Sequence, residues 1–183
     1  PGPLTVDTWF KRLVTSTIGG NACTEETNVI KVTVNNFNPG SIAADQTICE
    51  NTSASPLTSV TPTGDGTFTY KWLSSPDGAA FAQIGGAVSE MYSPGMLSAD
   101  TWYQRVVTST LSGKACVDST NIIKITVNNL DPGSISTDQT ICENGDPAAF
   151  TSGVPSYDGT LSYMWQSSSD GLNFTDIGVT TET

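Results

Sequence analysis

The residues of this sequence that most plainly suggest chemistry are its four cysteines. Cys23 and Cys116 are 93 residues apart, and so are Cys49 and Cys142. An even number of cysteines, held at one fixed period, predicts one disulfide in each repeated unit and an oxidising compartment. The alternative is a pair of buried free thiols in each unit. A zinc site is not expected, because the chain has no Cys-x-x-Cys pair and no histidine.

No set of residues in the sequence suits catalysis. There is no histidine for a catalytic triad, no Gly-x-Ser-x-Gly elbow and no phosphate-binding loop. A pair of carboxylates could serve a glycosidase, but the two groups would have to share a cleft. Repetition also argues against an enzyme, which needs only one site. We therefore expect no enzymatic activity.

The acidic residues raise the question of calcium. Calcium needs 6–8 oxygen ligands at one point, whereas isolated Asp-Gly pairs are typical of hairpin turns. Four aspartates precede a glycine in this way: Asp65, Asp77, Asp158 and Asp170. Asp131 with Asp138 is the better calcium candidate, although Asn38 stands 93 residues before Asp131. The expectation is turn residues and no metal, with Ca²⁺ as the alternative.

Charge and composition exclude two classes of partner. The net charge is −11, from 18 acidic and 7 basic residues, so there is no basic stripe for a nucleic acid. No apolar run approaches the roughly 20 residues that a membrane-spanning helix needs. Thr, Ser, Gly and Asn are abundant, which is typical of an extracellular β protein.

The chain repeats itself at the period of the cysteines. Residues 1–90 align without a gap on residues 94–183, and about half of the positions are identical. A period of 93 residues is the size of a small domain and too long for one turn of a solenoid. The sequence therefore predicts a tandem array of domains.

Strand patterns predict an all-β fold for each unit. In "FTYKWLSS", Tyr70 and Trp72 alternate with polar residues, and "NIIKITV" alternates in the same way. Many short strands with turns every 8–12 residues predict a β-sandwich. In "TWYQRVVTST" both faces carry large residues, so the pattern leaves open whether Trp102 or Tyr103 points into the core. The predicted core residues are Tyr70, Trp72, Ile123, Ile125, Val127, Tyr163 and Trp165.

The phrases "NNFNPGS" and "NNLDPGS" are predicted to join successive domains, because their proline cannot continue a strand ladder. This joint gives the C-terminal part of one domain at 1–37, a complete domain at 38–130 and the N-terminal part of the next at 131–183. Neither flanking piece could fill a core alone. A short joint containing proline should leave the domains little freedom.

This division favours a disulfide between Cys49 and Cys116, which both lie in the complete domain. The rival pairing of Cys23 with Cys49 crosses the joint. Strand 28–34 would carry the chain roughly 20 Å from Cys23, whereas bridged α-carbons lie about 5.5 Å apart. Closing a loop of this size should contribute about 4 kcal/mol of stability.

Several phrases resemble a known family. They are "DQTICEN", "GDGTFTYKWLSSPDGAAFAQIGGAVSEMYSPGMLSADTWYQRVVTST", "ACVDSTNIIKITVN" and "YMWQSSSDGLNFTDIG". Together they are similar to the immunoglobulin-like tandem repeats of very large Bacteroidota cell-surface adhesins, especially SprB-type gliding motility adhesins. The resemblance implies an Ig-like β-sandwich, export by the type IX secretion system and display on the outer membrane. It also implies O-glycosylation at Ser119, in the triplet Asp118-Ser119-Thr120.

The expected function is that of a structural shaft in such an adhesin, which serves cell adhesion and gliding motility. Its partners would be neighbouring repeats, the outer-membrane gliding or secretion machinery and surface polysaccharide. One alternative is a carbohydrate-binding repeat, in which exposed aromatic residues such as Trp9 or Trp102 would form a platform. Another is an accessory region of a secreted hydrolase.

Overall fold

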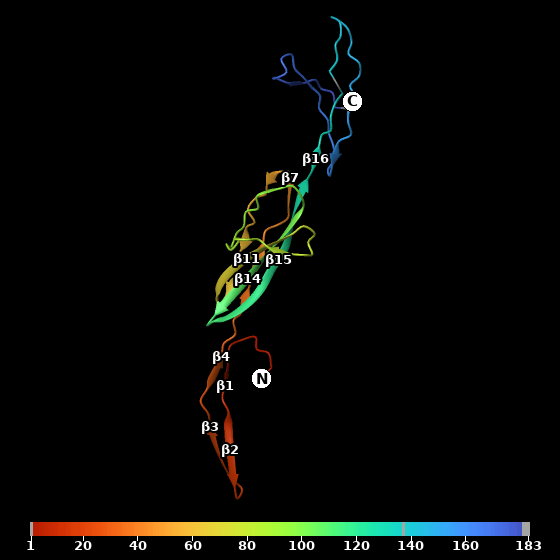
Figure 1. Cartoon of the computed structure of the whole chain (residues 1–183). Coiled ribbons are helices and arrows are strands. Elements are labelled where there is room, and N and C mark those ends of the chain that lie inside the picture. The colour runs from red at the N-terminus through yellow and green to blue at the C-terminus, as the bar shows by residue number, and fades with distance from the viewer. Residues whose placement is uncertain (1, 137, 181–183) are drawn as a thin grey trace. The chain divides into compact units, whose positions relative to one another are not determined.

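The computed structural model describes residues 2–136 and 138–180, and these residues form strands and loops without any helix, which confirms the predicted all-β class (Figure 1). The contacts between residues divide the chain into two compact units. The first unit holds the residues up to Ala44 together with Leu57–Tyr92 and Trp102–Ile123. The second holds Asp45–Pro56, Ser93–Thr101 and the residues from Lys124 onward.

The strands are β1 (Thr8–Phe10), β2 (Leu13–Ile18), β3 (Asn21–Glu26), β4 (Ile30–Val32), β5 (Phe37–Asn38), β6 (Ser41–Ile42), β7 (Gln46–Cys49), β8 (Thr52–Ser53), β9 (Ser59–Val60), β10 (Thr63–Gly64), β11 (Thr67–Ser75), β12 (Ala82–Gln83), β13 (Met96–Leu97), β14 (Thr101–Leu111), β15 (Lys114–Asn128), β16 (Leu130–Asp131), β17 (Ser156–Tyr157), β18 (Gln166–Ser167) and β19 (Thr175–Asp176). Three strands are long, β11, β14 and β15, with 9, 11 and 15 residues, and each of the others has six residues or fewer.

The main sheet has five strands in the order β12-β11-β14-β15-β7. β11 runs antiparallel to β14, with Trp72 opposite Arg105. β7 runs parallel to the end of β15, with Cys49 opposite Asn128. The other pairings are two-stranded sheets: β1-β4, β2-β3, β5-β10, β6-β9, β8-β13, β16-β17 and β18-β19.

Aromatic residues form the core of the first unit. The ring of Trp72 lies 5.6 Å from that of Tyr92, which lies 5.9 Å from the ring of Tyr103. The buried indole of Trp72 also donates from Nε1 to the Ser89 carbonyl at 2.9 Å. Tyr103 is buried and Trp102 is half-buried. The structure thus answers the question that alternation left open, because Tyr103 has an aromatic partner inside the unit.

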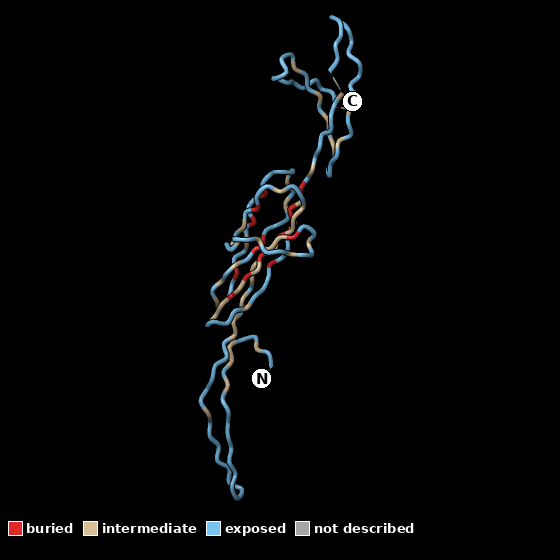
Figure 2. Tube along the Cα trace, viewed as in Figure 1, coloured by how far each residue is buried: buried red, intermediate tan, exposed pale blue. Residues whose placement is uncertain are grey.

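The buried aliphatic residues follow the predicted strand faces. In the first unit, Val107 and Ile123 are buried, and in the second unit Ile125 and Val127 are buried. Figure 2 shows the buried residues in the middle of the chain, whereas the two end segments are mostly exposed.

Residues 93 positions apart are counterparts in sequence, yet their burial differs sharply. Ile123 is 2% exposed, while its counterpart Ile30 is 57% exposed. Ile125 is completely buried, while its counterpart Val32 is 40% exposed. Among residues 2–136 and 138–180, β4 pairs only with β1, and its side chains are exposed.

The β14-β15 hairpin turns through only two residues. Ser112 and Gly113 have φ values of 49° and 78°, the left-handed pair that a type I′ turn requires. Gly19 and Gly20, their counterparts, have φ values of 57° and 85° between β2 and β3. The same hairpin is therefore built in both places.

The Asp-Gly pair at residue 77 is a turn, as its hydrogen bonds show. One carboxylate oxygen of Asp77 accepts from the amides of Ala79 and Ala80, both at 2.9 Å, and from the Ser75 hydroxyl at 2.7 Å. The Ala80 amide, the Ser75 hydroxyl and the Ala79 amide lower the pKa of Asp77 to about 2. Asp170, its counterpart, makes the same type of turn with Ser168.

This lowered pKa predicts acid sensitivity. Because the folded pKa lies below the unfolded value near 4, the Asp77 carboxylate stabilises the fold above pH 4, and its contribution is lost as the pH falls towards 2. Asp77→Asn keeps an acceptor oxygen but cannot titrate. Thermal unfolding followed by circular dichroism should show a lower midpoint for Asp77→Asn at pH 6, and the difference should disappear near pH 2. A constant difference across this range would contradict the prediction.

Candidate interface between repeats

Asn35 carries the most specific polar contacts at the predicted joint between residues 1–37 and 38–130. Its side-chain amide donates to the Ser109 carbonyl at 3.0 Å and to the Lys114 carbonyl at 3.4 Å. The Ser109 hydroxyl donates in return to the amide oxygen of Asn35 at 2.9 Å. Ser109 is fully buried, so Asn35 is held against the end of the β14-β15 hairpin.

The backbone after Asn35 continues this contact within the first unit. The Asp65 amide donates to the Asn36 carbonyl at 3.2 Å, and β5 pairs with β10. The rings of Phe37 and Phe68 lie 6.3 Å apart. Gly64 has a φ of 147°, and a side chain there would meet the Asn36 carbonyl oxygen at 2.3 Å, so this close approach requires glycine.

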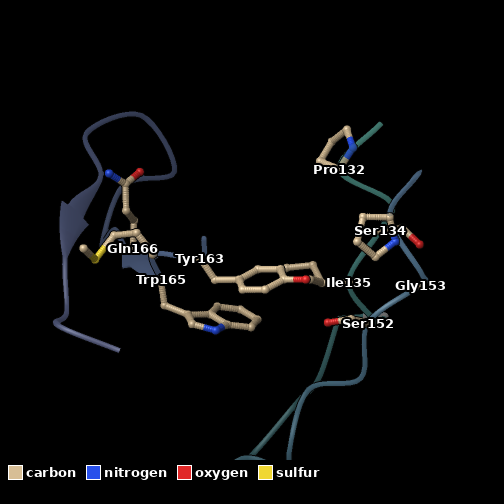
Figure 3. A pocket seen from close by; sticks show the side chains of 10 residues that line it. Pro132, Ser134, Ile135, Ser152, Gly153, Tyr163, Trp165 and Gln166 are labelled. Carbon is tan, nitrogen blue, oxygen red and sulfur yellow. The ribbon is translucent and has the colours of Figure 1, made fainter. Parts of the chain in front are cut away.

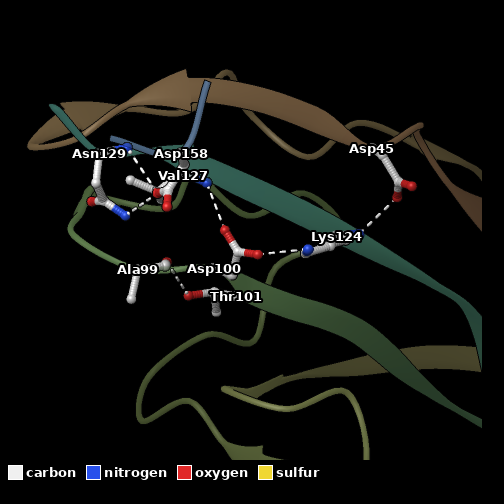
Figure 4. Close-up of polar contacts among 8 residues, drawn as sticks. All are labelled: Asp45, Ala99, Asp100, Thr101, Lys124, Val127, Asn129 and Asp158. Atoms are coloured by element: carbon white, nitrogen blue, oxygen red, sulfur yellow. Dashed lines mark hydrogen bonds and ion pairs between the residues drawn. The ribbon is translucent and has the colours of Figure 1, made fainter. Parts of the chain in front are cut away.

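The second unit repeats the backbone contact one period later. The Asp158 amide donates to the Asn129 carbonyl at 3.2 Å, as Asp65 does to Asn36. Asn129 also donates from its side-chain amide to the Asp158 carboxylate at 2.7 Å (Figure 4). The backbone contact at the predicted joint therefore recurs with the sequence period.

An aspartate fixes the strand that leads into each joint. The Asp100 carboxylate accepts from the Val127 amide at 2.8 Å and pairs with Lys124 at 2.5 Å (Figure 4). Its counterpart Asp7 accepts from the Val34 amide at 2.8 Å. The Lys124 ammonium, followed by the Val127 amide, lowers the pKa of Asp100. The pair is half-exposed, so it positions the strand and adds at most about 1 kcal/mol.

Arg105 is a fully buried cation in the first unit. Its guanidinium donates to the carbonyls of Glu90 at 2.8 Å, Pro39 at 2.9 Å and Val60 at 3.4 Å. It also lies 5.3 Å from the centre of the Tyr70 ring. Its Nε has no partner among the described residues, and burial lowers the pKa of the group. The guanidinium thus holds three separate chain segments together.

A pocket of about 260 Å³ lies in the second unit (Figure 3). Tyr163 and Trp165 extend from one wall, and Pro132 and Ile135 lie on the opposite wall. Pro132 and Tyr163 are the counterparts of Pro39 and Tyr70, which surround Arg105. The pocket therefore corresponds in position to the surroundings of Arg105 in residues 38–130.

The cysteines do not form the predicted disulfide between Cys49 and Cys116. All four are free thiols: Cys116 is half-buried, and Cys23, Cys49 and Cys142 are exposed. Cys49 lies opposite Asn128, which is twelve residues beyond Cys116 on β15. A strand rises about 3.3 Å per residue, so the two ends of this stretch lie about 40 Å apart. The prediction was wrong because both cysteines border the same strand at opposite ends.

The remaining predicted residues have plain structural positions. Tyr70, Tyr163 and Trp165 are half-buried, and the ring of Trp165 stacks on Phe150 at 5.7 Å. Ser119 is exposed, and its amide donates to the Asp118 carboxylate.

The calcium candidates do not form a cluster. The Asp131 carboxylate accepts from the Gly133 amide at 2.9 Å, as the Asn38 side chain does from Gly40 at 2.8 Å. No group of three or more acidic, cysteine or histidine side chains that could hold a metal occurs among residues 2–136 and 138–180. No helix of the described chain is long and apolar enough to cross a membrane.

Sequence reasoning missed Asn35, Ser109 and the carbonyl acceptors of Arg105. The available signal was that Asn35 and its counterpart Asn128 stand in the same repeated phrase, "TVNN". Burial of Ser109 could not be read from the sequence, because it depends on the register of the long hairpin.

Comparison with known proteins identifies a domain family. No curated protein and no solved structure matches the chain. A family model described as a domain of unknown function, DUF8696, matches residues 38–129 and again residues 131–183. The two matches cover most of the sequence, and the chain belongs to this family of domains.

Proposed function

We propose that this chain is a structural segment of a tandem array of Ig-like β-sandwich domains, in which 38–130 is one complete repeat and 1–37 and 131–183 are parts of its neighbours. The observation that carries the proposal is the recurrence of the joint. Asp65 contacts Asn36 and Asp158 contacts Asn129 through the same backbone hydrogen bond at the same distance. A joint that recurs with the sequence period supports a regular spacer.

The proposed setting is the shaft of a large cell-surface adhesin, exported by the type IX secretion system and held at the outer membrane for attachment and gliding. The resemblance of the repeated phrases to SprB-type adhesins supports this setting. The net charge of −11, from 18 acidic and 7 basic residues, would keep neighbouring shafts soluble and apart. The direct partners would be the adjoining repeats, and surface polysaccharide or the gliding machinery would bind elsewhere in the protein.

The carbohydrate-binding alternative requires exposed aromatic residues that recur with the period. Trp9 is 59% exposed, and Lys31 lies 5.0 Å from the centre of its ring. Its counterpart Trp102 is half-buried, close to Gly78. The exposed indole at Trp9 is therefore not repeated at Trp102, which favours the structural role over carbohydrate binding. Selective binding of this chain on a glycan array would reverse that preference.

Small-angle X-ray scattering tests the array. A compact globule of 183 residues should have a radius of gyration of about 16 Å. We expect a clearly larger value and a skewed distance distribution, because the short joints contain proline and are fixed by hydrogen bonds. A value near 16 Å would contradict the proposal.

A further inference from the structure

We infer that disulfides in this protein link successive repeats across the joint, from the strand cysteine of one repeat to the hairpin cysteine of the next. The strand cysteines are Cys49 and Cys142, and the hairpin cysteines are Cys23 and Cys116. This inference rests on the proposed array of like domains. It assigns a covalent site to residues that cannot bond within one repeat.

The strand cysteine lies at the end of its repeat that leads into the joint. Cys49 is opposite Asn128 in the parallel pairing of β7 and β15, and the Glu50 amide donates to the Asn128 carbonyl at 3.1 Å. Neighbouring strands lie about 4.8 Å apart, so the side chains of Cys49 and Asn128 are adjacent on one face. The strand cysteine of any repeat therefore lies beside the asparagine that ends its last long strand.

The hairpin cysteine lies at the opposite end of its repeat. Ser16 is opposite Cys23 in the pairing of β2 and β3, and their counterparts are Ser109 and Cys116 in the β14-β15 hairpin. Opposite residues in antiparallel strands have α-carbons about 4.5–5.5 Å apart, with side chains on the same face. Cys116 therefore lies beside the buried Ser109.

The contacts of Asn35 indicate how the exit end of one repeat would meet the hairpin end of the next. Asn35 is the counterpart of Asn128, and its side chain forms hydrogen bonds with both the hydroxyl and the carbonyl of Ser109. It also donates to the carbonyl of Lys114, two residues before Cys116. In the array, the strand cysteine of the preceding repeat would lie beside Asn35 and the hairpin cysteine beside Ser109, on the two sides of this contact. Cys49, which lies beside the counterpart Asn128, is exposed and so is accessible to such a partner.

The pairing also removes a difficulty that the structure raises. Within one repeat the two cysteines are separated by about 40 Å of strand, whereas bridged α-carbons lie about 4.4–6.8 Å apart. Across the joint, each strand cysteine meets one hairpin cysteine. In formation of the bond, two thiols lose two protons and two electrons. Oxidised glutathione accepts them and leaves as two molecules of reduced glutathione.

A tandem chain of two copies of the 183-residue sequence tests the inference. Residue 183 of one copy is joined to residue 1 of a second copy through Met-Tyr-Ser, the residues at 91–93, which keeps the 93-residue period. After oxidation in a glutathione buffer, thiol alkylation and non-reducing peptide mapping should find two linkages. Cys49 of the first copy should be bonded to Cys23 of the second, and Cys142 of the first to Cys116 of the second. Half of the thiols should remain alkylatable.

Paired substitutions identify the copy that supplies each thiol. Cys23→Ser in the second copy should abolish the Cys23–Cys49 linkage, whereas Cys23→Ser in the first copy should leave its yield unchanged. The single chain, oxidised at low concentration, should retain four alkylatable thiols.

Three results would overturn the inference. The first is a Cys49–Cys116 linkage. The second is a Cys23–Cys49 linkage that persists when Cys23 of the second copy is replaced. The third is full alkylation of the thiols, or a random mixture of pairings, in protein whose circular dichroism spectrum shows β-sheet. Scattering from the reduced tandem chain separates this failure from failure of the array. Extended particles without the linkages would overturn the disulfides and leave the proposed array intact.

Discussion

Replacing Arg105 with alanine is expected to lower the free energy of unfolding by about 3–5 kcal/mol. The side chain is fully buried, and its guanidinium donates to the carbonyls of Pro39 and Glu90 at 2.9 and 2.8 Å. Alanine would leave these acceptors without their donor and open a cavity above the Tyr70 ring. Both effects act in the same direction. They outweigh the relief of no longer burying a charge, because the two terminal nitrogens of the guanidinium donate to three backbone carbonyls.

The chain supplies its own control at Arg12, the counterpart of Arg105. Arg12 is exposed, so Arg12→Ala should change the free energy of unfolding by less than about 0.5 kcal/mol. Urea denaturation followed by circular dichroism measures both variants on the same transition. Equal effects of the two substitutions would show that Arg105 does not hold the core together as described.

Replacing Trp72 with alanine should destabilise the chain by about 3–5 kcal/mol as well. Trp72 is completely buried, packs on Tyr92 and donates to the Ser89 carbonyl. The substitution removes the largest buried side chain of the first unit and leaves the Ser89 acceptor unpaired. We expect a lower urea midpoint and a loss of the near-ultraviolet aromatic signal.

Trp165 is the matched control for this variant. It is half-buried and contacts Phe150, so Trp165→Ala should cost about 1 kcal/mol or less. A tryptophan-to-alanine change therefore reports the environment of each site rather than the residue type. A larger loss at Trp165 than at Trp72 would contradict the burial pattern described above.

Local patterns predicted the strands and their faces because alternation with a period of two is a property of neighbouring residues. Ile123, Ile125 and Val127 are buried and Lys124 lies between them, as the phrase "NIIKITV" indicates. Alternation did not decide whether Trp102 or Tyr103 is buried, because both faces of their strand carry large side chains. Tyr92, which comes from a distant loop, decides that Tyr103 is in the core.

Pairings between distant segments could not be read in the same way. The parallel register of β7 with β15 places Cys49 opposite Asn128, and no local pattern specifies it. Without that register, two cysteines in one repeat look like natural partners, and this led to the wrong disulfide. The hydrogen bonds of Arg105 were missed for the same reason, since its acceptors are backbone carbonyls that any residue provides.

The parallel pairing of β7 with the end of β15 has a mechanical consequence. The chain enters β7 at Gln46 and leaves β15 at Asn128, and the two strands run in the same direction. Tension along the chain therefore pulls the strands past one another along their axes, so the interstrand hydrogen bonds bear the load together instead of opening one at a time. A unit with this geometry should resist stretching at the paired end of β15. The force needed to separate the strands should fall sharply when Glu50 is replaced by proline, which removes the amide that donates to the Asn128 carbonyl at 3.1 Å.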